Sequence, residues 1–310
     1  MHPHLLTWAL SNPWAMRPEA MAAYAIVLAS HYAGERALAA ALANHEPQAG
    51  ADAKVAAEMQ GGNRAVGNVA VIPVMGPIVE WPHQVDVCEG GTSTRAILRA
   101  MAAVEADDTI AGAVMVFATP GGSVYGVAEA GDAINRVKAK KPVYGVAQSL
   151  AASAGYWLLS QCTEAYCSPG GEVGSIGVYS GHQDISRALE MQGVRIELFS
   201  AGKFKTEGHP FGPMSEEGKD FAQKRAQDYY GDFTRAVAKG RGVAVDAVRT
   251  GMGEGRVLGA KDALAEKMID GIATMEEVIA KMQRQARAQP GRRASVASAE
   301  AQIALLRASC

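Results

Sequence analysis

Short apolar segments separated by helical segments constrain the fold of this chain more than any other sequence feature. The run at residues 113–117 is apolar at every position, which is typical of a strand buried on both faces of a parallel sheet. Residues 69–74 and 142–147 are similar runs, and residues 92–104 and 123–137 have the apolar spacing of helices. Strands and helices that alternate in this way predict an α/β architecture.

The same patterns divide the chain into three parts. We expect residues 1–68 to form an N-terminal helical arm and a linker, because an alanine-rich segment (18–43) precedes a polar, glycine-bearing one (46–68). Residues 69–282 form the α/β domain. Residues 283–310 are predicted to be a disordered basic tail, because arginine, alanine, glutamine and serine dominate its first half. Within the domain we also expect helices at 153–159, 185–192 and 215–239, an extended segment at 174–178 and a strand at 194–199.

Composition excludes several functional classes. The formal net charge of -2, with scattered lysine and arginine, gives no basic stripe for nucleic acid. The sequence contains no uninterrupted apolar run of 18 residues, and its first residues lack the positive region of a secretory signal. We therefore expect a cytoplasmic protein without a membrane anchor.

The four cysteines do not follow the spacing of a zinc site. Cys88, Cys162, Cys167 and Cys310 include no CxxC pair. We interpret them as reduced, partly buried thiols and expect neither a metal nor another cofactor.

Ser153 is the candidate nucleophile. It follows a predicted strand, begins a predicted helix, and has small neighbours that leave space for a peptide. A serine hydroxyl needs a base within hydrogen-bonding distance, and a neutral lysine amine can serve. Lysine is charged at pH 7 unless burial lowers its pKa, so a lysine base requires a narrow apolar cleft. Lys203 and Lys205 are both candidates for this base, and for each the alternative is an exposed surface lysine.

Two other segments supply supporting groups. Gly121 and Gly122 lie in a turn between a buried strand and a helix, where backbone N–H groups can form an oxyanion hole. A tight turn between a strand and a helix needs glycine in any case, so a structural turn is the alternative role of these glycines. Ser175 is a candidate for orienting the lysine amine, and its alternative role is that of an ordinary turn residue. Ser153 likewise has the alternative of a helix N-cap.

Four segments, taken in order, resemble peptidase family S49, which includes signal peptide peptidase A and phage capsid-maturation proteases. They are 119–122, 153–155, 174–178 and 202–205, and the likeness extends from about residue 69 to 272. The resemblance implies a ClpP/crotonase-like fold and a catalytic dyad of Ser153 and Lys205, with Ser175 positioning the lysine. In the mechanism that follows, Gly121 or Gly122 and Ala154 hold the oxyanion.

Within the family, the phage head proteases are the nearer likeness. The sequence Asn-Pro-Trp-Ala-Met at 12–16, the helical segment after it, and the Ser-Ala-Gly at 153–155 are similar to theirs. This resemblance implies cleavage of scaffold, portal or capsid proteins in the bacterial host cytoplasm or inside a procapsid. It also implies a homo-oligomer whose neighbouring subunits complete an apolar cleft.

Three alternatives remain open besides a cytoplasmic protease similar to signal peptide peptidase. One is a Ser-His-Asp triad that uses His182 and Asp184, although both follow a turn and Asp184 suits the start of a helix. Another is a non-catalytic capsid assembly protein of the same fold, since fold alone does not determine function. The last is a crotonase-type acyl-CoA enzyme, which would share the oxyanion turn.

Overall fold

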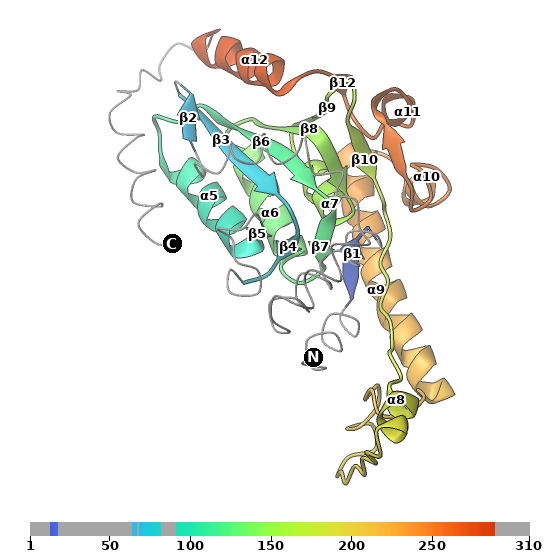
Figure 1. The fold of residues 1–310 in the computed structure, drawn as a ribbon. Helices are drawn as coiled ribbons and strands as arrows, with labels where there is room; N and C mark the ends of the chain where they lie inside the picture. The colour runs from blue at the N-terminus through green and yellow to red at the C-terminus, as the bar shows by residue number, and fades with distance from the viewer. Residues whose placement is uncertain (1–12, 18–63, 67, 82–90, 289–310) are drawn as a thin grey trace. The chain divides into compact units, whose positions relative to one another are not determined.

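A mixed, largely parallel sheet forms the centre of the computed structural model, which describes residues 13–17, 64–66, 68–81 and 91–288. Strands β3 (Val69–Met75), β6 (Gly112–Thr119), β8 (Val143–Ala152) and β9 (Glu164–Cys167) are parallel neighbours in that order. The apolar runs in the sequence thus form the buried centre of the sheet, as predicted (Figure 1). The α/β fold class is confirmed.

Shorter strands extend this sheet at both edges. On one side, β2 (Arg64–Val66) pairs antiparallel with β3. On the other, β10 (Glu172–Gly174) pairs parallel with the end of β8 and antiparallel with β11 (Val257–Gly259), and β12 (Gly271–Ile272) pairs with β9. β8 therefore contacts β9 with its first half and β10 with its last residues.

A second, small sheet lies beyond the carboxyl ends of the central strands. Its order is β1 (Trp14–Met16), β7 (Gly121–Ser123), β4 (Ile78–Val79) and β5 (Thr92–Ser93). The ladder between β6 and β8 shifts register just before this sheet, so that Thr119 pairs with Ala151. That irregularity brings the loop after β6 beside the end of β8.

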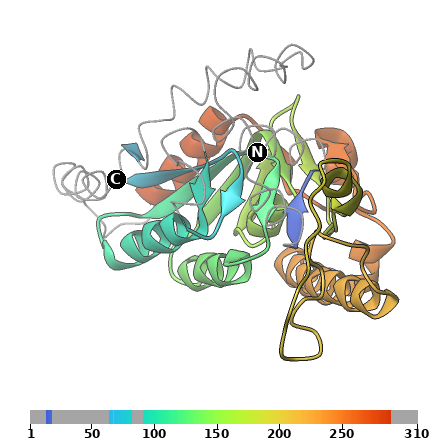
Figure 2. The same cartoon turned by 60° about the horizontal axis from the view of Figure 1, so that its bottom comes forward.

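Helices cover both faces of the central sheet. α5 (Thr94–Ala106) and α6 (Val127–Lys138) lie on one face and α12 (Met275–Ala288) on the other (Figures 1 and 2). Val114 and Val116 of β6 pack against Val278 and Met282 of α12. Met115 between them points to the opposite face, because side chains alternate along a strand. Strands covered on both sides need apolar residues at every position, which explains the continuous runs.

The remaining helices are α7 (Ala154–Leu159), α8 (Ser186–Met191), α9 (Glu216–Arg241), α10 (Val245–Arg249) and α11 (Ala260–Ala265). The chain divides into two compact units. The larger contains residues 15–17, the described parts of 47–177, and 232–288. The smaller contains residues 13–14 and 178–231, with α8 and the first part of α9. In the smaller unit Trp14 and Tyr179 exchange two backbone hydrogen bonds, of 2.9 and 3.1 Å.

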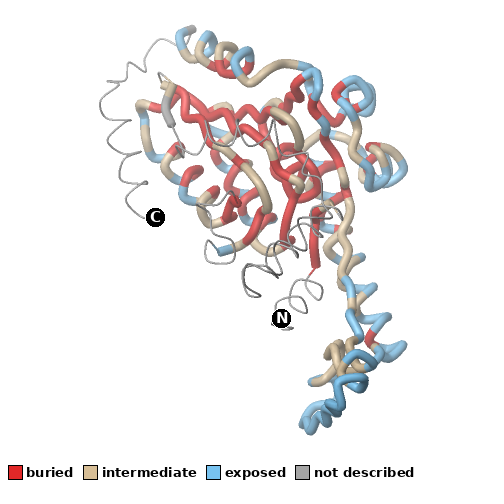
Figure 3. Tube along the Cα trace, in the orientation of Figure 1, coloured by how far each residue is buried: buried red, intermediate tan, exposed pale blue. Residues whose placement is uncertain are grey.

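The structure corrects three expectations about secondary structure. Residues 194–199 are not a strand, because none of the strands that the structure describes pairs with them. This segment is exposed (Figure 3). The predicted linker contains β2. The predicted disordered tail is helical as far as Ala288, because Gln283 donates to the Val66 carbonyl (3.1 Å) and fixes this end of α12. The predicted arm helices at 18–43 lie outside the described residues.

Candidate active site

Ser153 occupies a strained turn between β8 and α7. Its backbone angles, φ 54° and ψ −116°, are uncommon for a residue with a side chain. Such a conformation costs on the order of 1–3 kcal/mol and persists only where the surroundings enforce it. The Ser153 N–H donates to the Gly174 carbonyl at 2.7 Å, and the residue is only 1% exposed. The turn therefore holds the serine at the carboxyl edge of the central sheet.

The glycine loop after β6 contacts this turn directly. A Cβ atom built on Gly121 would lie 2.9 Å from Ser153 Cβ, and one built on Gly155 would lie 2.4 Å from Thr119 Cγ2. Gly121 also has φ +99°, which side chains rarely adopt. Both glycines are therefore required for the close approach, and the structure confirms that the loop and Ser153 lie side by side.

Thr119 holds the glycine loop in place through two hydrogen bonds. Its hydroxyl donates to the Gly76 carbonyl (2.6 Å) and accepts from the Gly121 N–H (3.1 Å). The Gly121 N–H is thus engaged by the Thr119 hydroxyl, and the assignment of Gly121 or Gly122 as an oxyanion donor stays a prediction. Gly122 pairs with Ile78 in the small sheet. Ala154 is the first residue of α7, where N–H groups precede the helical ladder.

The segment after β10 lies against the other side of Ser153. The Ser153 hydroxyl is 3.4 Å from the Gly177 carbonyl, a contact longer than an ordinary O–H···O hydrogen bond. Ser175 in the same segment has φ 54°, and its N–H donates to the Arg256 carbonyl at 2.7 Å. The larger unit therefore brings together Ser153, the glycine loop and the segment that contains Ser175.

The two candidate lysines belong to the smaller unit and differ in their contacts. Lys203 forms an ion pair with Glu217 (3.1 Å), and its amine lies 4.5 Å from the centre of the Phe204 ring. The Lys205 side chain is exposed. The burial that a lysine base requires is therefore not present around Lys205 in the single chain, and the pairing of Ser153 with Lys205 stays a prediction.

His182 and Asp184 have other partners in the smaller unit. His182 Nε2 lies 3.1 Å from the Gly212 carbonyl, and Asp184 accepts a hydrogen bond from the Ser186 N–H (2.9 Å) at the start of α8. The hydrogen bonds from Ser186 lower the pKa of Asp184. These contacts fit the helix-start role of Asp184 better than the triad.

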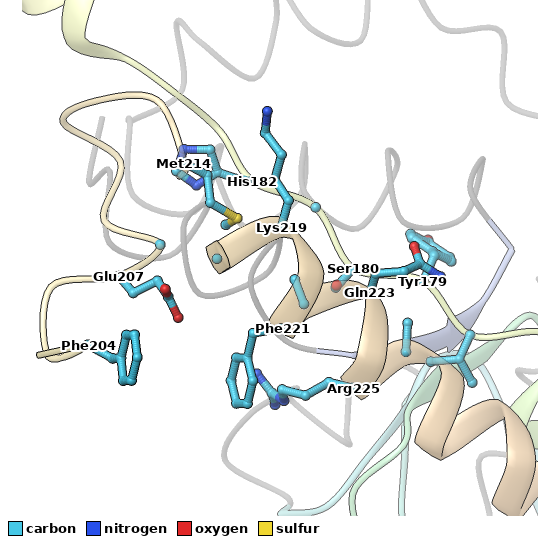
Figure 4. Close-up of a pocket in the computed structure, with 16 residues that line it drawn as sticks. Tyr179, Ser180, His182, Phe204, Glu207, Met214, Lys219, Phe221, Gln223 and Arg225 are labelled. Carbon is cyan, nitrogen blue, oxygen red and sulfur yellow. The ribbon is translucent and has the colours of Figure 1, made fainter. Parts of the chain in front are cut away.

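The smaller unit also contains a cavity of about 620 Å³ that the sequence patterns did not predict. Phe204 and Glu207 reach it from a loop, and Phe221 and Arg225 from α9 (Figure 4). Phe221 is 56% exposed. The i, i+4 spacing of Phe221 and Arg225 on a helix is a signal that could have indicated this lining.

Two of the four cysteines lie in the described part of the chain. Cys162 and Cys167 are free and buried, as expected, and burial raises the pKa of each thiol to about 12. Within the described ranges, no group of three or more His, Cys, Asp or Glu side chains is placed to hold a metal ion. Nor does the described part of the chain include a helix long and apolar enough to cross a membrane.

Comparison with known proteins decides the family. A model of peptidase family S49 matches residues 135–289, which is half of the chain and includes Ser153, Ser175 and Lys205. The chain belongs to peptidase family S49. The family relation that the sequence motifs suggested is therefore confirmed.

Similar proteins come from phages and from a plant. Capsid assembly protease C of Escherichia phage lambda is 30% identical over 185 residues, covering 60% of this chain and 42% of that protein. Head-tail preconnector protein GP5 of Enterobacteria phage P21 is also 30% identical, with 60% and 37% covered. The chloroplastic serine protease SPPA of Arabidopsis thaliana is 29% identical, with 45% and 21% covered. The S49 chain thus spans less than half the length of each of these relatives.

Proposed function

We propose that this S49 chain is a serine endopeptidase with a ClpP/crotonase-like fold, in which Ser153 is the nucleophile and Lys205 the base. The observation that carries the proposal is the strained Ser153 turn, held against the glycine loop at the carboxyl edge of the sheet. Ser175 positions the lysine amine, and the N–H groups of Gly122 and Ala154 hold the oxyanion. Gly121 allows the loop to approach Ser153 closely because it has no side chain.

The reaction requires two acyl-transfer steps. The Lys205 amine removes the Ser153 proton while the hydroxyl oxygen attacks the peptide carbonyl, and the oxyanion forms beside the loop. The ammonium returns the proton to the leaving amine, which departs as the acyl-enzyme forms. The same amine then deprotonates a water molecule that hydrolyses the ester and restores Ser153. Preorganised N–H donors lower both barriers because they need no rearrangement as charge develops.

The contacts of the two lysines favour Lys205 as the base. The Lys203 amine already pairs with the Glu217 carboxylate. Lys205 must instead lose water around its amine, and the single chain leaves it exposed. We therefore propose that a second copy of the chain covers Lys205 in a homo-oligomer.

Proteolysis of an unfolded protein tests the dyad. We expect the wild-type chain to cleave casein, Ser153→Ala to abolish cleavage, and Lys205→Ala to slow it about 100-fold to 10,000-fold, since general base catalysis contributes that much. Lys203→Ala is the matched control, because it removes a neighbouring amine from the same segment, and its rate should stay within about threefold of the wild type. Equal rates for Lys205→Ala and the wild type would refute the base. Full cleavage by Ser153→Ala would refute the nucleophile.

The phage relatives support a more specific role. Because the lambda relative is named a capsid assembly protease, we propose that this chain cleaves scaffold, portal or capsid proteins in the host cytoplasm or inside a procapsid. Purified chain incubated with head proteins encoded beside its own gene should generate new termini that N-terminal sequencing locates. Ser153→Ala is the control and should leave those proteins intact.

The similarity to the putative signal peptide peptidase SppA of Enterococcus faecium, which is 27% identical over 177 residues, supports a second candidate, a cytoplasmic protease similar to signal peptide peptidase. Synthetic signal peptides presented in the same assay separate the two roles. Preferential cleavage of head proteins supports the phage role, and cleavage of signal peptides alone supports the cellular one. A non-catalytic assembly protein would cleave neither.

A further inference from the structure

Strand β1 covers the edge of β7 beside the candidate nucleophile. β1 is the outermost strand of the small sheet, and β7 begins at Gly121, the residue that contacts Ser153. The Arg17 N–H, just after β1, donates to the Pro120 carbonyl at 3.0 Å. A segment from the N-terminal part of the chain therefore occupies the strand position closest to the catalytic turn.

The backbone of β1 lies so close to the glycine loop that Gly121 has no room for a side chain. A Cβ atom built on Gly121 would lie 2.2 Å from the Ala15 carbonyl oxygen and 2.9 Å from Ser153 Cβ. The Ala15 carbonyl, the Gly121 backbone and the Ser153 side chain thus lie close together. An extended segment therefore already runs along the glycine loop beside Ser153.

Burial shows that β1 is packed in place. Trp14, Ala15 and Met16 are 1%, 0% and 2% exposed. After the strand, Arg17 lies 3.9 Å from the Glu172 carboxylate, an exposed ion pair that contributes little to stability. Backbone pairing and burial therefore hold the segment, which is the way an extended peptide adds to a sheet edge.

We propose that β1 is an intramolecular blocking strand, which occupies the position of an extended substrate peptide and must leave β7 before substrate can bind. The inference builds on the proposed function, since it takes Ser153 as the nucleophile. The chain in the described conformation is then self-blocked. The occupant of the site in the free protein is the segment at residues 13–17, and an incoming peptide competes with it.

Peptide binding tests this blocking strand without any need for catalysis. The probe is a fluorescein-labelled peptide with the sequence of residues 13–17, and all proteins carry Ser153→Ala to prevent turnover. Ala15→Glu places a carboxylate at a fully buried position, and Arg17→Pro removes the N–H that Pro120 accepts while keeping the preceding residue extended. Each should displace β1 and lower the Kd for the peptide at least tenfold, measured by fluorescence anisotropy.

Matched controls separate displacement from nonspecific effects. Ala15→Ser adds one atom, and Arg17→Gln removes the charge but keeps the backbone donor, so both should bind the peptide within about twofold of the parent. Equal affinity in Ala15→Glu, Arg17→Pro and the parent would overturn the proposal. Circular dichroism verifies that each variant is folded.

A second measurement uses the parent protein without a substitution in β1. We expect excess unlabelled peptide to speed hydrogen exchange of the amides at residues 14–17, because the peptide displaces them. Unchanged protection at every peptide concentration would overturn the proposal, even if the β1 variants do not fold. A shift in binding without Ser153-dependent casein cleavage would support the blocking strand and refute the peptidase. Ser153-dependent cleavage without the shift would refute the blocking strand alone.

Discussion

Replacing Thr119 by valine should loosen the glycine loop that lies beside Ser153. The Thr119 hydroxyl is buried and makes two hydrogen bonds, to the Gly76 carbonyl and from the Gly121 N–H. Valine keeps the shape of threonine but leaves the buried Gly121 N–H without a partner, at a cost of about 1–3 kcal/mol. The bond to Gly76 contributes about 1 kcal/mol more. We therefore expect Thr119→Val to lower the free energy of unfolding by about 2–4 kcal/mol.

Thr119→Ser is the control because it keeps the hydroxyl and removes the methyl group that lies against Gly155. Its loss should be about 1 kcal/mol, the value of one buried methyl group. Urea unfolding of both variants measures the difference, with unchanged m-values showing that the unfolded state is comparable. If Thr119→Val stays within about 0.5 kcal/mol of the wild type, or if Thr119→Ser is equally damaging, the hydrogen bonds of Thr119 do not hold the loop and the reasoning is wrong.

Two further predictions concern the packing around the site. Burial alone would raise the pKa of Asp270, but hydrogen bonds from Arg241 outweigh it and hold the pKa below its usual value. The stabilisation by this ion pair is fully present above the unfolded-state pKa of about 3.9 and is lost as pH falls through the folded-state pKa. Asp270→Asn should therefore lower the free energy of unfolding by about 1–2 kcal/mol at pH 7, a value discounted for partial exposure, and by much less near pH 3. Equal losses at both pH values would contradict this. Phe233 is fully buried and stacks on Trp157, with 4.7 Å between the two ring centres. Phe233→Ala should therefore lower the free energy of unfolding by about 3–5 kcal/mol, measured by thermal unfolding. A loss below about 1 kcal/mol would show that the ring is not a core contact.

The strands and helices of the central sheet could be predicted from sequence because their signals are local. The run at 113–117 must be covered on both faces whatever its neighbours are, and it forms β6. The turn at Ser153 is likewise indicated by a strand followed at once by a helix, with small residues on both sides of the serine. In both cases the residues that give the signal are the residues that form the structure.

The features that sequence reasoning missed depend on distant partners. Residues 194–199 alternate like a strand, yet none of the described strands pairs with them. β1 is a strand only because β7 offers it an edge more than one hundred residues later. The engagement of the Gly121 N–H by Thr119 depends on the geometry of one loop. Patterns of single residues do not report such pairings.

Covalent labelling tests most directly whether Ser153 is a nucleophile that Lys205 activates. A fluorophosphonate probe reacts only with an activated hydroxyl, and mass spectrometry of the digested adduct identifies the residue. We expect an adduct on Ser153, labelling at least 100-fold slower in Lys205→Ala, and unchanged labelling in Lys203→Ala. An adduct on another residue, or equal labelling in Lys205→Ala and the wild type, would contradict this expectation.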